Sequence, residues 1–251
     1  MNRVSFWKIF SPVLFLLLWY AVAALIGAPL ILPYPHAVLI RLFELVRTSF
    51  FWKAFAFTFL RVIISFLISM LAGFFLGLFA ADSKGFAALI DFPLELIRAT
   101  PVIALILPAL FWFTSGLVPV FVAVLMCLPI VITGAKKGFE KNPENLEKLF
   151  RVNSRGIKGF KAFLYVRLPS AMPAFLSAAE SAFGLAWKVV AAGEVLSIPK
   201  RGAGSLMQQA QVHLESCDVL AITFAIVIVS YLCQQLLTWL ASSLRAERSN
   251  P

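Results

Sequence analysis

Charged residues are scarce in this 251-residue sequence, in which only 14% of the residues are Asp, Glu, Lys or Arg. A soluble globular domain usually carries about 25% charged residues. Because 61% of the residues are hydrophobic, the chain has too few charged side chains to cover a water-facing surface of its size. The composition excludes an ordinary soluble domain and predicts a membrane protein.

Cysteine and histidine are also rare, with three and two residues respectively. Cys127, Cys217 and Cys233 lack CxxC spacing, so they predict neither a disulfide framework nor a zinc site. The sequence has no G-x4-G-K-[ST] nucleotide loop, no Gly-x-Ser-x-Gly elbow and no HExxH motif. We therefore expect no enzyme, catalytic residue, metal or cofactor, and any ATP that drives this protein is hydrolysed on another polypeptide.

The net charge of +10 comes from basic residues that flank or separate long apolar runs. A nucleic-acid-binding domain would instead gather them in a stripe with interleaved aromatic residues. In a membrane protein, an excess of basic residues marks the loops that stay in the cytoplasm. The pattern argues for a lipid bilayer and against a nucleic-acid partner.

Six apolar segments are candidates to cross a bilayer, whose core of about 30 Å needs roughly 20 helical residues. The uncharged stretch 99–135 would be about 55 Å long as one helix, and Thr114-Ser115-Gly116 offers a turn between two spans. The first run also resembles a signal peptide, although it is longer than a typical apolar core of one. We expect spans near residues 9–32, 62–81, 171–198 and 219–240 and two within 99–135, the first recruiting part of 86–98.

The segment 136–170 is rich in charge and holds nine of the 22 basic residues. If this segment and both termini are cytoplasmic, fifteen basic residues lie inside and five outside, as the positive-inside rule requires. The sequence therefore predicts a single all-α transmembrane domain over residues 1–251. We expect a multi-pass protein of the cell inner membrane with a cytoplasmic loop at 136–170 and both termini in the cytoplasm.

The predicted cytoplasmic loop contains two short amphipathic helices joined at Gly156, the second of which is expected to end at Pro169. Such a pair is typical of a docking element for a partner protein, or of a hairpin that rests on lipid headgroups. Apolar residues of the first helix share one face at i, i+3 and i+4, namely Leu146, Leu149 and Phe150.

The motif Gly156-x9-Val166-x-Leu168-Pro169 resembles the cytoplasmic-loop signature of ABC importer permeases, EAA-x3-G-x9-I-x-L-P. The front half of the signature differs, because the EAA positions hold Phe150, Arg151 and Val152 and the nearest acidic residue is Glu147. The wider chain is similar to the nitrate/sulfonate/taurine-type group of these permeases. The motifs that carry this similarity are Leu32-Pro33-x-Pro35, Thr58-x2-Arg61-Val62, Arg98-x2-Pro101 and Gly184-Leu185-Ala186-Trp187 leading to Glu194.

The resemblance implies a type I (MetI-like) permease fold with about six transmembrane helices. It also implies a second permease copy in a homodimer, a cytoplasmic ABC ATPase subunit and an extracytoplasmic substrate-binding protein. Family substrates would be nitrate, sulfonates, taurine or a vitamin precursor, which are mostly small anionic or zwitterionic solutes. Residues that would couple to the ATPase are Leu146, Glu147, Leu149, Phe150, Gly156, Val166, Leu168 and Pro169.

Prolines and charges inside the spans are candidates for the translocation pathway. Pro101 and Pro108 interrupt the third span, and broken helices often line the substrate route of a transporter, although an ordinary kink is the alternative. Lys188 lies near mid-membrane, so it either lines the route or pairs with Glu180 or another element. Glu194 lies near the outer end, where we expect it to be solvated, and it is also a pathway candidate.

Small residues recur at every fourth position on two spans and predict close helix contacts, within the subunit or between subunits. One ridge is Ser65, Ser69, Gly73, Gly77 and Ala81, and the other is Ala174, Ala178, Ala182 and Ala186.

The sequence favours an ATP-driven importer permease that works by alternating access, with two alternatives. A stand-alone secondary transporter would use Glu180, Lys188 and Glu194 for ion coupling. A membrane scaffold would have no transport role.

Overall fold

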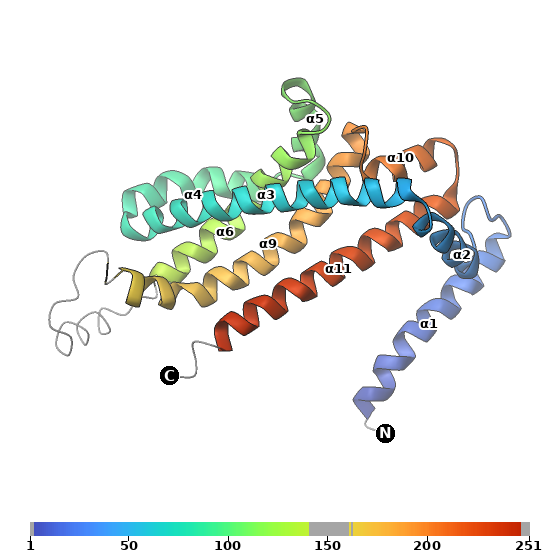
Figure 1. The fold of residues 1–251 in the computed structure, drawn as a ribbon, viewed down its shortest axis with the longest axis horizontal. Coiled ribbons are helices and arrows are strands. Elements are labelled where there is room, and N and C mark those ends of the chain that lie inside the picture. Colours follow the sequence, from blue (N-terminus) through green and yellow to red (C-terminus); the bar gives the residue numbers. More distant parts are fainter. Residues whose placement is uncertain (1–2, 141–160, 162, 247–251) are drawn as a thin grey trace.

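The computed structural model describes residues 3–140, 161 and 163–246. Within these ranges every regular element is a helix (Figure 1), which confirms the predicted all-α fold. The elements are α1 (Arg3–Ile26), α2 (Pro35–Val46), α3 (Ser49–Asp82), α4 (Lys84–Ala99), α5 (Val102–Trp112), α6 (Val118–Glu140), a π-helical turn η1 (Phe163–Arg167), α9 (Leu168–Ser197), α10 (Ala203–Val212) and α11 (Ser216–Ala246).

Several of these helices are long and apolar enough to cross a membrane. Four helices of the described chain meet this test alone, and α4 with α5 makes a fifth if this bent pair counts as one span. The first predicted span, near residues 9–32, corresponds to α1, whose apolar part, Phe10–Ile26, is shorter than the others. The four are Ser49–Asp82, Val118–Glu140, Phe163–Ser197 and Ser216–Trp239.

Helix α3 begins well before the predicted span 62–81, because a cap is available upstream. The Thr48 hydroxyl accepts a hydrogen bond from the backbone N–H of Phe51, which satisfies one of the free donors of the first turn. At the other end, Ser83 caps α4 in the same way by accepting from Phe86 N–H. The earlier start brings Thr58 and Arg61 into the helix.

Close backbone contacts hold α3, α6 and α9 together. A Cβ added to Gly77 of α3 would lie 2.5 Å from Cβ of Ala135 in α6, and one added to Gly134 of α6 would collide with the side chain of Ala178 in α9. Small residues permit this approach inside a bilayer, where hydrophobicity does not favour protein over lipid. Both predicted ridges therefore pack within the subunit.

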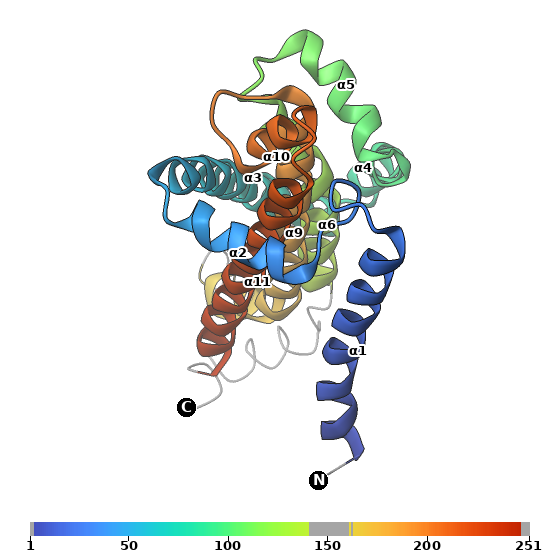
Figure 2. The same ribbon diagram turned by 90° about the vertical axis from the view of Figure 1, so that its right-hand side faces the viewer.

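The long helices lie alongside one another, whereas α1 stands apart from them in both views (Figures 1 and 2). Trp19 of α1 stacks on Phe224 of α11 with ring centroids 5.6 Å apart. Its indole N–H also donates to the Pro33 carbonyl at 3.1 Å. The turn between α3 and α4 lies at the same end of the bundle as η1, and α2 and α10 lie at the opposite end (Figure 1).

We expect Gly134→Ala to lower the free energy of unfolding by about 1–3 kcal/mol, because the added methyl group overpacks the α6–α9 contact. The measurement is the midpoint of thermal unfolding of the purified protein in detergent. Gly85→Ala is the matched control, since the nearest atom to a Cβ there is 4.0 Å away. Equal midpoints for the two variants would contradict the proposed packing.

Candidate functional site

A buried ion pair joins α3 to α9 at the end of the bundle that carries α2 and α10. Arg61 Nη1 lies 2.5 Å from Glu194 Oε1. The Glu194 side chain is fully buried and that of Arg61 is 12% exposed. Thr58, one turn before Arg61 on α3, donates its hydroxyl hydrogen to Glu194 Oε2 at 2.8 Å. The carboxylate therefore has both a cation and a hydroxyl partner on α3.

The same residues also hold two connecting segments. Arg61 donates from Nε to the Gly116 carbonyl at 3.2 Å and from Nη1 to the Arg201 carbonyl at 2.8 Å. The Thr58 hydroxyl accepts from Ala203 N–H at 2.8 Å. We call Thr58, Arg61 and Glu194, with their backbone partners, the outer polar network; it ties α3, α9, the turn before α6 and the start of α10 together.

Glycines after α9 allow the chain to fold back over Glu194. A Cβ on Gly202 would lie 2.6 Å from the Glu194 carboxyl carbon, and one on Gly204 would lie 2.7 Å from Glu194 Cβ. Gly204 N–H donates to Glu194 Oε2 at 3.0 Å. The expectation that Glu194 is solvated is therefore wrong, because residues 202–204 cover it. Its assignment to the pathway stays a prediction.

The sequence did not predict the pairing of Arg61 with Glu194, which becomes possible because α3 starts before residue 62 and includes Arg61. The opposite charges of Arg61 and Glu194 could have indicated the pair, because charged side chains within a bilayer must face water or each other. Thr58 and Arg61 are spaced i, i+3 and so share one face of α3. Their contact with Glu194 could not be predicted from local sequence patterns, because the two positions are separated from Glu194 by more than 130 residues along the chain.

The third span is broken between Ala99 and Val102, where α4 and α5 meet at 103°, so of the two alternatives at Pro101 the structure has the broken helix. Helix α5 begins at Val102 with Pro101 as its N-cap and without a side-chain cap bond. The Thr100 hydroxyl instead donates to the Leu96 carbonyl at 2.7 Å. Pro101 and Pro108 are both exposed on the described chain, and their role in the pathway stays a prediction.

Lys188 is exposed on α9, and no ion pair or hydrogen bond engages its ammonium within the residues that the structure describes. The alternative that it pairs with Glu180 in the same chain is therefore not what the structure shows. A cation at the centre of a transmembrane helix costs about 2.5–3.5 kcal/mol on insertion scales. Lys188 thus calls for a polar environment outside this single chain.

Most of the predicted coupling residues, namely Leu146, Glu147, Leu149, Phe150 and Gly156, lie outside the described residues. Downstream of them, Val166 is buried in η1 and Leu168 packs against the apolar cluster formed by Ala135, Phe139 and Ala171. The expectation that a helix ends at Pro169 is wrong. Pro169 lies in the first turn of α9, directly after the π-helical turn η1, and the helix continues through it.

Residues 163–168, at the C-terminal end of the predicted coupling segment, contact two other helices. The guanidinium of Arg167 forms an ion pair with Asp82 at the end of α3. Arg167 also lies over the ring of Phe139 in α6, 5.5 Å from its centroid, and Phe163 stacks on the same ring. Residues 163–168 are therefore connected to α3 and α6 and continue directly into α9.

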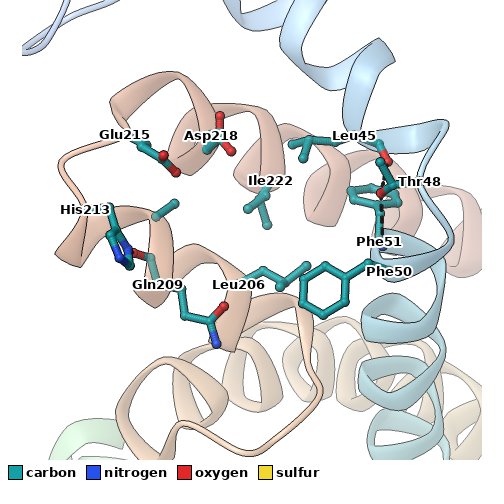
Figure 3. Close-up of a pocket in the computed structure, with 11 residues that line it drawn as sticks. Leu45, Thr48, Phe50, Phe51, Leu206, Gln209, His213, Glu215, Asp218 and Ile222 are labelled. Carbon is teal, nitrogen blue, oxygen red and sulfur yellow. Dashed lines mark hydrogen bonds between the residues drawn. The ribbon is translucent and has the colours of Figure 1, made fainter.

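A cavity of about 310 Å³ opens at the same end of the bundle, between the α2–α3 junction, α10 and the start of α11 (Figure 3). Phe50 and Phe51 form its apolar side, and His213 and Glu215 lie on the opposite side (Figure 3). Asp218 accepts from Arg41 Nε at 2.5 Å, and this bond raises the pKa of Arg41 above its usual value. The cavity combines an apolar wall with hydrogen-bonding groups.

Comparison with known proteins defines the class. The family described as binding-protein-dependent transport system inner membrane component matches residues 73–246, which is more than half of the chain. The chain belongs to this family and is an ABC importer permease component. A crystal structure of an amino acid ABC transporter with histidines has the same fold, with a TM-score of 0.62 at 18% identity over 83% of this chain and 96% of that chain.

Three curated relatives place the chain more narrowly. The taurine transport system permease protein TauC of Escherichia coli K12 is 25% identical over 87% of this chain and 81% of its own length. The putative aliphatic sulfonates transport permease protein SsuC of the same organism is 28% identical over 88% and 82%. The glycine betaine transport system permease protein OpuAB of Bacillus subtilis 168 is 26% identical over 75% and 66%. The resemblance to the nitrate/sulfonate/taurine group is confirmed, and these relatives are permeases rather than enzymes.

We expect Arg61→Met to destabilise the protein by about 3–5 kcal/mol, because it leaves the Glu194 carboxylate buried without its cation. The Arg61→Met, Glu194→Met double variant should lose less stability than the sum of the losses in the two single variants. A double-mutant cycle, measured by thermal unfolding in detergent, gives this difference. Arg47→Met at an exposed arginine is the control. Additive losses would show that the two side chains do not interact.

Proposed function

We propose that this chain forms the translocation pathway of an ATP-driven importer and works by alternating access on a small anionic or zwitterionic solute. Its partners are an ABC ATPase subunit, an extracytoplasmic substrate-binding protein and a second copy of this chain in a homodimer. The names of the relatives support the solute class, since taurine, aliphatic sulfonates and glycine betaine each carry a sulfonate or carboxylate group.

The observation that carries the proposal is the attachment of residues 163–168 to the bundle. Arg167 pairs with Asp82 of α3 and lies over Phe139 of α6, while the chain continues without a break into α9. A partner that moves the 142–169 segment would therefore move α9 and pull on the ends of α3 and α6. Such a connection is what coupling to a separate motor requires.

Within the segment we assign the docking face to Leu146, Leu149 and Phe150, with Gly156 setting the angle of the second helix. Glu147 supplies the acidic charge near this face. Val166, Leu168 and Pro169 form the junction with α9.

Helix α9 links this junction to the outer polar network. Its 30 residues span about 45 Å at 1.5 Å per residue, so its two ends lie on opposite sides of a bilayer. At the far end Glu194 holds α3 and the start of α10 through Arg61 and Thr58. Movement of α9 would thus reach the outer end, which is the physical basis for alternating access.

We assign the route to the faces that carry Pro101, Pro108, Glu180 and Lys188, with Glu194 at its outer end. The α4–α5 break supplies backbone groups that water or a substrate can bind. The end with α2, α10 and the cavity of Figure 3 would face the binding protein, and the end with the 142–169 segment would face the cytosol, together with both termini.

The test is uptake by proteoliposomes that contain this chain, its ATPase and its binding protein, with radiolabelled taurine, an aliphatic sulfonate and glycine betaine as probes. We expect uptake of at least one probe that requires ATP and the binding protein. Uptake by this chain alone under an ion gradient would instead establish a secondary transporter. Absence of uptake and of probe-stimulated ATP hydrolysis would refute the transport role.

Leu149→Asp and Gly156→Pro should each abolish most ATP-dependent uptake and weaken co-purification of the ATPase, because they disrupt the docking face and the joint behind it. The protein should still insert into the membrane, as its yield after detergent extraction will show. Val212→Asp, at an exposed residue of α10 at the opposite end, is the control for ATPase association. Normal ATPase association and normal uptake in both loop variants would disprove the assignment of this segment.

A further inference from the structure

Helix α9 has one exposed face that is unlike a lipid-facing surface. Ser177, Ser181, Lys188 and Ala192 are all exposed, and their spacing of four or seven residues puts them on one face. Between Leu60 and Phe79, the exposed residues of α3 are instead large and apolar. They include Leu60, Ile64, Leu67, Leu71 and Phe75. Since lipid favours the second kind of surface, the α9 face is built for water, solute or protein.

A glutamine of α11 adjoins this face. A Cβ added to Gly184, which lies between Ser181 and Lys188, would be 3.2 Å from Gln234 Oε1 and 3.3 Å from Gln234 Nε2. Gly184 therefore leaves room for the Gln234 amide against α9. Gln234 is itself exposed, and Thr238 one turn further along α11 is also exposed.

The Gln234 amide lies against α9 at Gly184, one helical turn before Lys188. Lys188 follows Gly184 by one turn, which is about 6 Å along the axis. Because helical side chains lean toward the N-terminus, the long Lys188 side chain can extend over the turn that carries Gly184. Within the described chain neither the ammonium nor the amide has a hydrogen-bond or ion-pair partner. Ser181 does not compete for them, because its hydroxyl donates to the Ser177 carbonyl at 3.1 Å.

We infer that Lys188 and Gln234 together recognise the anionic group of the transported solute, a sulfonate or carboxylate, at a membrane-depth position on the translocation pathway. This inference rests on the proposed function and adds Gln234 to it as a specificity-determining residue. The ammonium supplies charge and three donors, and the amide supplies two directional N–H donors. The positive charge on a polar, exposed face raises the local concentration of anions over cations.

The test measures this preference with anionic and cationic thiol reagents, methanethiosulfonate ethylsulfonate and methanethiosulfonate ethyltrimethylammonium. The full-length protein is placed in membranes with Cys127, Cys217 and Cys233 replaced by alanine and with Gln234→Cys as the reporter. We expect the anionic reagent to be favoured, and Lys188→Gln to lower the ratio of anionic to cationic reaction rates by about tenfold. Lys188→Arg should preserve the ratio, because it keeps the charge.

Gln235→Cys is the matched control, since the neighbouring position is also exposed but lies about 100° around α11. Its rate ratio should not respond to Lys188→Gln. The inference would be overturned if Gln234→Cys did not react, or if its ratio of anionic to cationic reaction rates did not change on Lys188→Gln. The reaction needs neither ATP nor cargo, so a failure here is distinguishable from a failure of the uptake experiment. Elution as a single species on size exclusion confirms that each variant is folded.

Discussion

The ion pair between Arg61 and Glu194 is the constraint on which the rest of the structure depends. Both charges lie within spans, and leaving either without its partner costs several kcal/mol. Satisfying the pair fixes the rotation of α3 against α9. Because Arg61 also binds the carbonyls of Gly116 and Arg201, the same interaction positions the turn before α6 and the segment that leads into α10. One buried carboxylate thereby organises an entire end of the bundle.

The other end is organised by contacts of a different kind. Small residues bring α3, α6 and α9 together with almost no space between their backbones, as at Gly77 and Gly134. A unit packed in this way moves as a body, because interiors at this density transmit strain. Arg167 and Asp82 join this unit to the chain that precedes α9. Under the proposed function, a force that the ATPase applies to the 142–169 segment would be carried along α9 to Glu194.

Much of the fold followed from hydropathy and small-residue periodicity, which place the long spans and their tight faces. Proline chemistry located the interruption of the third span at Pro101 but did not distinguish a broken helix from a kink. Local rules failed where distant segments meet. No local pattern tells that Glu194 is covered by residues 202–204 rather than by water, since this depends on a chain reversal after Ser197. Likewise, proline is common both just after the end of a helix and in the first turn of one, so the sequence at Pro169 fits either. The packing of Leu168 against α6 makes Pro169 part of the start of α9.

The account requires the 136–170 segment to lie in the compartment that contains ATP. Labelling of a single cysteine at residue 150, in intact cells and in inverted membrane vesicles, tests this requirement most directly. The account predicts that a membrane-impermeant maleimide labels Phe150→Cys in inverted vesicles and leaves it unlabelled in intact cells. Labelling in intact cells would place the segment outside, where no cytoplasmic ATPase can reach it, and would contradict the whole account.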